Sequence, residues 1–251
     1  MSWDPQQYLK FAQQREQPCK DLMSRLEGPF DRILDLGCGP GNSTGLLAQC
    51  FPKAELIGLD PDERMLEKAR TDYPKLTFVK GRAPEDFDRL GAGFDLIFSN
   101  ACIHWIVDQQ GLIQGAAKAL RPGGIFAVQI PLTGEAPFYK MLYRLVNCRW
   151  GKLKEVDNFH SLDQTGYYNA LIRSFKEVEI WRTDYCHVME RKMVLEWYRG
   201  SGLRPYLERL TDAERTLFLA DLTAQIEREY PLLADGNVFL TMPRLFFLAR
   251  R

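Results

Sequence analysis

Short apolar runs alternate with amphipathic helical segments across residues 31–130, and this alternation constrains the fold more than any other feature. The apolar runs are predicted to be strands and lie at 31–36, 54–60, 76–80, 93–100 and 123–130. Strands that are apolar almost throughout and are linked by helices form a parallel sheet between two helical layers. Right-handed crossovers then place a ligand site at the carboxyl ends of the strands.

The pattern changes after residue 131. Segments 135–173 and 189–230 are mostly helical in pattern and rich in aromatic residues, whereas 175–188 and 237–251 alternate like strands. We therefore predict an α/β fold, a doubly wound, mostly parallel seven-stranded sheet of Rossmann-like type with a helical cap. The chain is predicted to be one domain, with a core of residues 1–134, 174–188 and 236–251 and a cap of residues 135–173 and 189–235.

Charge and cysteine content exclude several classes of function. Lys and Arg together number 33, as do Asp and Glu, so no basic surface for nucleic acid or anionic membrane is expected. The 6 cysteines show no C-x-x-C spacing, and no metal site is predicted. The first residues lack a basic and apolar leader pattern, and no apolar run is long enough to span a bilayer. We expect a cytoplasmic monomer that acts on a small molecule.

The stretch LDLGCGPGNS, at residues 34–43, follows the first predicted strand and has glycines at alternate positions, Gly37, Gly39 and Gly41. Without Cβ atoms, such a turn lets a ligand approach the backbone. It differs from a dinucleotide-binding loop, because Asn42 replaces the third glycine, and it lacks the Lys-Ser/Thr pair of a phosphate loop. Asp35, just before the turn, would repel a diphosphate but attract an ammonium group. Alone, the loop could equally be a tight turn that binds nothing.

A carboxylate at the end of the second predicted strand adds to this signal. Asp60 lies 19 residues beyond Gly41, and an acid at this spacing can accept hydrogen bonds from both hydroxyls of a ribose. A lone acid there could instead cap the next helix, but Asp62 can supply that cap. The loop and the acid together favour a nucleoside ligand.

DLGCGPGNS followed by LIGLDPDERML resembles the class I S-adenosylmethionine-dependent methyltransferases. Other stretches resemble the trans-aconitate methyltransferase family within that class, over almost the whole chain: WDPQQYLKFAQQREQP, NACIHWI, IWRTDYCHVM, GSGLRPYLERLT and MPRLFFLARR. The resemblance implies S-adenosyl-L-methionine as cofactor. It also implies transfer of a methyl group to a carboxylate of a small polycarboxylic acid, most simply trans-aconitate, giving a monomethyl ester and S-adenosylhomocysteine.

The resemblance also implies cofactor-binding residues at matching positions. The methionine portion would be held at the turn, the ribose at the second strand, the adenine by the following helix, and the sulfonium after the fourth strand; the residues are Asp35, Gly37, Cys38, Gly39, Gly41, Asp60, Pro61, Met65, Asn100 and Ala101. On an N-terminal helix, Tyr8, Phe11 and Arg15 share one face, and Arg15 could pair with the methionine carboxylate. That helix could also be an ordinary packed amphipathic segment.

The sequence departs from the family's pattern at the adenine. Many class I enzymes carry an acid after strand three, where this chain has Arg82. Adenine would then be read through the backbone near Arg82 and Ala83. Glu85 and Asp86 come later and could cap a helix instead.

Candidate substrate residues follow from the chemistry that the resemblance implies. An ionised carboxylate attacks without a general base, and its fellow carboxylates need cationic partners, for which arginine is suited. His104 and Trp105 follow the fourth strand directly and are our candidate catalytic residues. The family carries Gln at the position of His104, a departure that bears on substrate preference. The candidate substrate-binding residues are His160, Arg182, Tyr185, Arg199, Arg204 and Arg244, of which at least half could be solvated surface groups.

Two rival functions stay open. The chain could methylate a hydroxyl or amine of another small molecule, with His104 as general base. It could also be a cofactor-binding protein without catalysis, or a nucleotide-binding oxidoreductase. The missing third glycine argues against the oxidoreductase, and the stretch SNACIHW lacks the signature of nucleic-acid amino methyltransferases.

Overall fold

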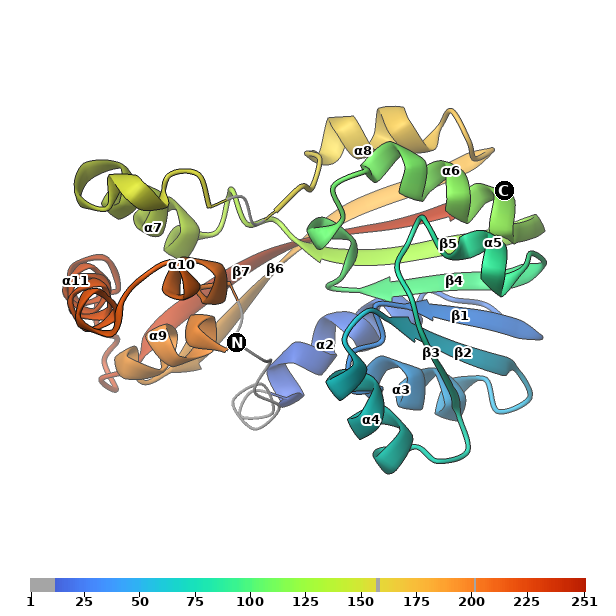
Figure 1. The fold of residues 1–251 in the computed structure, drawn as a ribbon, viewed down its shortest axis with the longest axis horizontal. Coiled ribbons are helices and arrows are strands. Elements are labelled where there is room, and N and C mark those ends of the chain that lie inside the picture. Colours follow the sequence, from blue (N-terminus) through green and yellow to red (C-terminus); the bar gives the residue numbers. More distant parts are fainter. Residues whose placement is uncertain (1–11, 157–158, 201) are drawn as a thin grey trace. The chain divides into compact units, whose positions relative to one another are not determined.

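The computed structural model describes residues 12–156, 159–200 and 202–251, with only the backbone of residues 12–15. A seven-stranded sheet runs through it in the order β3-β2-β1-β4-β5-β7-β6 (Figure 1). Its strands are β1 (Arg32–Leu36), β2 (Glu55–Asp60), β3 (Thr77–Lys80), β4 (Phe94–Asn100), β5 (Leu120–Pro131), β6 (Glu177–Met189) and β7 (Val238–Arg250). All seven predicted strands are confirmed, each within a few residues of its expected bounds.

The sheet contains both parallel and antiparallel pairs. β1 is parallel to β2 and β4, β2 is parallel to β3, and β4 is parallel to β5, whereas β5 and β7 are antiparallel. The four parallel pairs bring the carboxyl ends of β1, β2, β4 and β5 to one edge, where the sequence places the loop and the acids.

The helices are α2 (Ala12–Met23), α3 (Asn42–Cys50), α4 (Glu63–Asp72), α5 (Phe87–Leu90), α6 (Gln109–Ala119), α7 (Pro137–Arg149), α8 (Gln164–Leu171), α9 (Arg191–Arg199), α10 (Arg204–Glu208) and α11 (Asp212–Glu229). Two short 3₁₀ helices, Ile103–Trp105 and Gly151–Leu153, complete the elements. Within the described ranges, no helix is long and apolar enough to cross a membrane.

The chain divides into two compact units. One, here called the sheet unit, comprises Gln13–Pro131, Phe159–Thr183 and Arg244–Arg251; the other, here called the helical unit, comprises Met1–Ala12, Leu132–Asn158 and Asp184–Pro243. β6 and β7 extend from one unit into the other. Helix α8 was expected in the cap but belongs to the sheet unit, where it packs against α6. The connection after β5 therefore leaves the sheet unit and returns to it before β6, which the linear pattern does not reveal.

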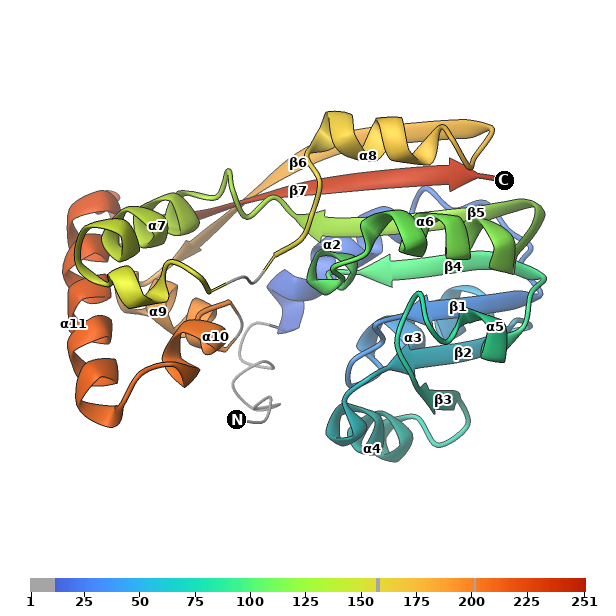
Figure 2. The same cartoon turned by 45° about the horizontal axis from the view of Figure 1, so that its top comes forward.

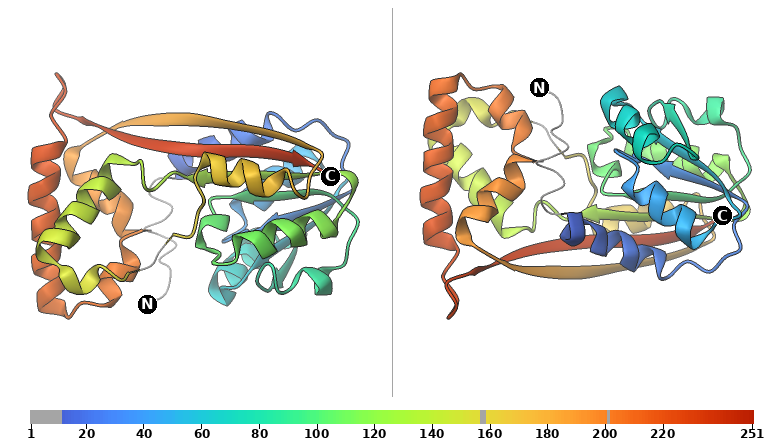
Figure 3. Two further views of the ribbon diagram at one scale, coloured as in Figure 1. Left: turned by 90° about the horizontal axis from the view of Figure 1, so that it is seen from above. Right: turned by 90° about the horizontal axis from the view of Figure 1, so that it is seen from below.

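Burial on both faces explains the strand composition of the sheet unit. Ile33 and Leu34 of β1 and all residues from Leu96 to Phe98 of β4 have no exposed surface. Helices α2 and α3 lie on one face of the sheet, and α6 and α8 lie on the other (Figure 3). Fully buried parallel strands need apolar residues at nearly every position, so the exception, Asp35, stands out.

The helical unit has its own aromatic core. Helix α11 packs against α7 and α9 (Figure 2). The rings of Phe138 and Tyr198 stack with centroids 3.6 Å apart, and Trp150 Nε1 donates a hydrogen bond to Asp221 Oδ2 at 2.9 Å. Thr211 and Glu214 form a capping box at the start of α11, which fixes where this long helix begins.

Candidate active site

The turn between β1 and α3 positions backbone N–H groups through three left-handed glycines. Gly37, Gly39 and Gly41 have φ values of 74°, 53° and 88°. A Cβ on Gly37 would lie 2.1 Å from Cys102 Sγ, so this glycine lets the turn pack against the segment after β4. A Cβ on Gly39 would meet no atom within 4 Å, so here the backbone borders open space. The turn thus has two packed glycines at its ends, and between them Gly39, where a side-chain atom would meet open space.

Asp35 is a buried carboxylate with one oxygen satisfied and one not. Its side chain is completely buried, and Oδ2 accepts hydrogen bonds from Ser43 Oγ at 2.7 Å and Thr44 Oγ1 at 2.6 Å. Oδ1 has no hydrogen-bond partner among the described residues. Burial raises the pKa of Asp35 to about 6, against the lowering effect of these two hydroxyls. A cationic group of a ligand would satisfy the free oxygen and favour the ionised form.

Asp60 closes the same turn from the end of β2. Its Oδ2 accepts from the Gly39 amide at 2.9 Å, and its Oδ1 accepts from the Asp62 amide at 2.9 Å. Burial raises its pKa, and these two amides lower it. Asp62 accepts from the Arg64 amide and is the N-cap of α4, so Asp60 is free of that capping role. Each Asp60 oxygen keeps a lone pair for a further donor.

Of the other expected cofactor residues near the turn, Cys38 has a packing role. Cys38 is 3% exposed and packs with Leu66, Ala69 and Phe78, and its amide donates to Leu59 O at 3.1 Å. Met65, on α4, is 6% exposed. Pro61, beside Asp60, is exposed.

In the segment after β3, Arg82 and Asp86 form hydrogen bonds with each other. The Arg82 amide donates to Asp86 Oδ2 at 2.7 Å, and the Arg82 carbonyl accepts from the Asp86 amide at 2.8 Å. Asp86 precedes α5 but makes no side-chain cap bond there. The sequence predicts that the backbone of Arg82 or Ala83 binds the adenine. Because the Arg82 amide already donates to Asp86, the Ala83 amide is the better candidate.

The segment after β4 carries a strained residue and an unsatisfied amide. Ala101 has φ +54°, a left-handed conformation that non-glycine residues rarely adopt. Its amide donates to Gln129 O on β5 at 2.8 Å. Asn100 Oδ1 is buried and has no hydrogen-bond partner in the described part of the chain. Strain of this kind concentrates at functional sites.

His104 and Trp105 lie in the 3₁₀ helix that follows. His104 is 3% exposed, and its ring packs against Trp105 and Phe159 at centroid distances of 5.1 and 5.4 Å. Its carbonyl accepts from the His160 amide at 2.8 Å. Burial, and then the charge of Arg244, lower the pKa of His104 to about 3, so its imidazole is uncharged at neutral pH. His104, Trp105, His160 and Arg244 thus gather in the sheet unit.

The chain is similar in sequence to known methyltransferases. A family model described as a methyltransferase domain matches residues 33–124. A trans-aconitate 2-methyltransferase of Azoarcus sp. (strain BH72) is 37% identical over 259 residues, which cover 100% of this chain and 99% of that protein. One from Rhodopseudomonas palustris (strain BisB18) is 38% identical over 255 residues, 98% of each chain.

The chain belongs to the trans-aconitate 2-methyltransferase family. It is an S-adenosylmethionine-dependent methyltransferase, which confirms the cofactor and the enzyme class that the resemblance implies. Among solved structures, phosphoethanolamine N-methyltransferase 2 of Haemonchus contortus with bound S-adenosylhomocysteine has a TM-score of 0.57 at 19% identity. The match covers 94% of this chain and 52% of that longer one, and it shows a shared fold.

The candidate site residues are distributed over both units of the chain. All expected cofactor residues from Asp35 to Ala101 lie in the sheet unit, with His104, Trp105, His160, Arg182 and Arg244. Tyr185, Arg199 and Arg204 lie in the helical unit. Tyr8 and Phe11 fall outside the described residues, and Arg15 is described only as backbone within α2.

The candidate arginines differ in burial. Arg244 is 8% exposed, whereas Arg182 is exposed. Arg199 Nη1 lies 2.9 Å from Glu196 Oε1, and Arg204 Nε lies 2.9 Å from Glu208 Oε1. The first pair is exposed and the second is partly exposed, and ion pairs in contact with solvent contribute little energy. Arg244 is the most buried of these four arginines.

Sequence patterns missed several polar residues of this site. Ser43 and Thr44 follow the turn at the start of α3, where hydroxyls facing the preceding strand could have been expected. Gln129 interrupts the apolar run IFAVQI; it is 1% exposed, and its Nε2 has no hydrogen-bond partner among the described residues. A single amide side chain within an apolar strand is the sequence signal that could have identified Gln129.

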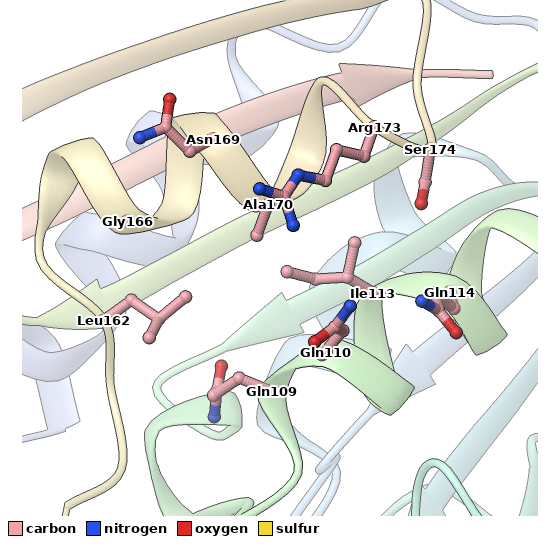
Figure 4. Close-up of a pocket in the computed structure, with 10 residues that line it drawn as sticks. All are labelled: Gln109, Gln110, Ile113, Gln114, Leu162, Gly166, Asn169, Ala170, Arg173 and Ser174. Carbon is pink, nitrogen blue, oxygen red and sulfur yellow. The ribbon is translucent and has the colours of Figure 1, made fainter.

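A hollow of about 270 Å³ lies elsewhere in the sheet unit, between α6 and α8 (Figure 4). Its lining includes Gln110, Ile113, Asn169 and Arg173. Because Asp35 bonds to α3, on the opposite face of the sheet, this hollow is separate from the turn. No group of three His, Cys, Asp or Glu residues in the described ranges could hold a metal ion.

Proposed function

We propose that this chain transfers a methyl group from S-adenosylmethionine to a carboxylate of trans-aconitate or a similar polycarboxylic acid, giving a monomethyl ester and S-adenosylhomocysteine. Arg244 is the observation that supports a carboxylate as the methyl acceptor. It is a buried guanidinium beside the uncharged His104, and a carboxylate matches its planar fork. The names of relatives that align over the whole chain support the same acceptor.

The residues of the sheet unit fit the cofactor. The free Oδ1 of Asp35 suits the ammonium group of the methionine portion, and the open backbone at Gly39 leaves room beside it. Asp60 retains lone pairs for the ribose hydroxyls. We assign the adenine to Met65, Pro61 and the Ala83 amide, and the sulfonium to Asn100 and Ala101. Arg15, with Tyr8 and Phe11, stays our candidate for the methionine carboxylate.

When bound, S-adenosylmethionine supplies an electrophilic methyl group: a carboxylate oxygen forms the new O–C bond as the S–C bond breaks, and its electron pair stays on sulfur. No proton has to move, because the attacking carboxylate is already ionised at neutral pH. The protein's task is to align the acid and remove water from it. His104 and Trp105, with Phe159, form an aromatic wall suited to exclude water. An uncharged His104 adds no positive charge that would pair with the attacking carboxylate.

His160 and Arg182 of the sheet unit stay our candidates for binding the acid's other carboxylates. We also propose that the helical unit is a cap domain, with Tyr185, Arg199 and Arg204 as its candidate substrate-binding residues. The sheet would then serve as a mostly parallel methyltransferase core. The enzyme is proposed to be a cytoplasmic monomer that handles small molecules. The equal numbers of acidic and basic residues argue against nucleic acid or an anionic membrane as its partner.

A labelled-methyl screen over small polycarboxylic acids tests this function. Trans-aconitate should accept label from S-adenosylmethionine, and mild base should release the label as methanol, as esters require. A base-stable product, or label transferred only to hydroxyl or amine compounds, would contradict a carboxylate acceptor. Calorimetric binding of S-adenosylmethionine and of NAD, measured side by side, should show affinity for the first alone.

A further inference from the structure

Polar side chains form a row across three neighbouring strands of the sheet unit. Asn100 of β4 pairs in register with Gln129 of β5, whose partner on β7 is Phe246. Arg244 lies two residues from Phe246 along β7. Register partners, and residues two apart in one strand, project from the same face of a sheet. Gln129 therefore lies between Asn100 and Arg244 in this row.

The row lies on the cofactor face of the sheet. Asp35 pairs in register with Phe98, which is two residues before Asn100 on β4. Asp35 thus projects from the same face as Asn100 and Gln129, and it bonds to Ser43 and Thr44 of α3. Three buried polar atoms without hydrogen-bond partners among the described residues share this face: Asp35 Oδ1, Asn100 Oδ1 and Gln129 Nε2.

Gln129 contrasts with the other buried glutamine of this unit. Gln109 is 6% exposed and fully satisfied: Nε2 donates to Ile103 O at 2.7 Å and to Ile106 O at 2.6 Å, and Oε1 accepts from Tyr167 OH at 2.9 Å. Gln109 therefore has a structural role. Gln129 makes no such bonds, and a buried donor without a partner destabilises the folded state. An apolar residue would fill the strand position better, so the amide points to a ligand.

Gln129 also lies next to the place of methyl transfer. Its carbonyl accepts the Ala101 amide at 2.8 Å, and this bond holds the left-handed turn at Ala101. Asn100 and Ala101 are the residues assigned to the sulfonium. Neighbouring strands are about 4.8 Å apart, so the Gln129 side chain starts one strand spacing from that position.

We propose that Gln129 is a specificity-determining residue that binds the acceptor carboxylate through its side-chain N–H. The inference rests on the proposed function and names the contact that selects its acceptor. The hydrogen bond falls on the oxygen that does not attack, which orients the group and leaves the lone pairs of the other oxygen free. A neutral amide suits this place, because a guanidinium there would form an ion pair and weaken the nucleophile. Arg244, further along the row, takes a second carboxylate of the same acid.

The test replaces Gln129 with Met, which keeps the length of the side chain and removes the donor. Calorimetry then measures binding of trans-aconitate to the enzyme saturated with S-adenosylhomocysteine. We expect Q129M to bind the acid about tenfold or more weakly, the loss of roughly one hydrogen bond to a charged group. Affinity for S-adenosylhomocysteine should stay within about twofold, and kcat/KM for the acid should fall with its binding.

A matched control is Q109M, which makes the same substitution at the satisfied glutamine. Q109M should lower the melting temperature, because hydrogen bonds to Ile103, Ile106 and Tyr167 are lost. Q129M should not lower the melting temperature, because no protein hydrogen bond is lost. Q109M should therefore lose stability, whereas Q129M should lose acid affinity without losing stability. This contrast distinguishes a structural role from a ligand-binding role.

Two outcomes would overturn the proposal in different ways. If the wild-type enzyme binds and methylates trans-aconitate and Q129M binds it equally well, Gln129 does not select the acceptor, and the proposed function stands. If the wild-type complex binds neither trans-aconitate nor any other polycarboxylate, the proposed function fails and this inference falls with it.

Discussion

The amide of Gly39 donates a hydrogen bond to Oδ2 of Asp60 at 2.9 Å, across 21 residues of sequence. This bond ties the glycine turn after β1 to the end of β2. The other Asp60 oxygen accepts from the Asp62 amide, so the carboxylate fixes both the turn and the start of α4. The residue expected to bind the ribose therefore also shapes the loop that borders the methionine portion.

Asp60→Ala should weaken S-adenosylmethionine binding more than it weakens the fold. Loss of charge-assisted bonds to the ribose should cost about 1.5–3 kcal/mol, which isothermal calorimetry will read as a Kd about ten- to a hundredfold higher. The control is Asp62→Ala, which removes the N-cap of α4 and should cost about 0.5–2 kcal/mol of stability. Asp62→Ala should leave the cofactor Kd nearly unchanged. Equal Kd values in the two folded variants would remove Asp60 from the site.

Gly39→Ala should impair cofactor binding through the space that the new methyl group occupies. A Cβ there meets no protein atom within 4 Å, so the stability loss should be limited to about 1 kcal/mol for a left-handed alanine. Gly236→Ala is the matched control, since Gly236 also has positive φ and an open Cβ position. Both variants should unfold at similar denaturant concentrations, and only Gly39→Ala should lose affinity. Normal binding by Gly39→Ala would make the loop a structural turn.

Gly37→Ala should act on stability instead. Its Cβ would lie 2.1 Å from Cys102 Sγ, and φ is +74°, so clash and strain combine. We expect a loss of about 1–3 kcal/mol, as for overpacked cores, measured by urea unfolding without ligand. A variant as stable as wild type would mean that the segment after β4 can move away from the turn.

Cofactor affinity should fall as pH drops through about 6, the pKa of Asp35. Protonation of Asp35 removes the negative charge that attracts the ammonium group of the cofactor. The cofactor therefore binds the ionised carboxylate, and below about pH 6 its binding releases a proton from Asp35. In the ligand-free enzyme the sign is opposite. Because the folded pKa is raised above 3.8, the contribution of Asp35 to stability is present at low pH and is lost as pH rises through about 6. Binding calorimetry from about pH 5 to 8 should show the first trend, and thermal unfolding from about pH 4 to 7 should show the second. Asp35→Asn should show neither.

Methyl transfer to a carboxylate should show no histidine-type pH dependence. The pKa of His104 is lowered to about 3, so its protonation state does not change near neutrality. With the cofactor saturating, kcat for trans-aconitate should stay flat between about pH 6 and 8, where an ordinary histidine base would titrate near 6.5. A fall centred near pH 6.5 that disappears in His104→Gln would favour the hydroxyl or amine acceptor instead.

Arg244→Met should reduce kcat/KM for the acid by at least about tenfold, or 1.4 kcal/mol, through a higher KM. Arg149→Met is the comparison, because Arg149 is exposed and pairs with Asp221 at 2.5 Å. We expect Arg149→Met to change kcat/KM much less, and KM in wild type to rise with ionic strength because exposed charges attract the acid from solution. If Arg244→Met leaves the acid kinetics unchanged, Arg244 does not bind the acid.

Local patterning was enough to predict the strands, the glycine turn and Asp60. A strand such as β1 is buried on both faces, so nearly every residue must be apolar, and that requirement is visible in the sequence itself. The turn needs left-handed backbone at Gly37, Gly39 and Gly41, which only glycine adopts without strain. Such features depend on each residue's own conformation and immediate neighbours.

Packing between distant segments decided the rest. His104 looks like an ordinary titrating histidine in sequence, but burial and Arg244, 140 positions further along, keep it uncharged. Helix α8 has a helical pattern wherever it lies, and only its contact with α6 places it in the sheet unit. Gln129 differs from Gln109 only in the partners that the fold provides. Desolvation and hydrogen-bond satisfaction depend on what the folded chain brings within a few ångströms, and no local pattern contains that information.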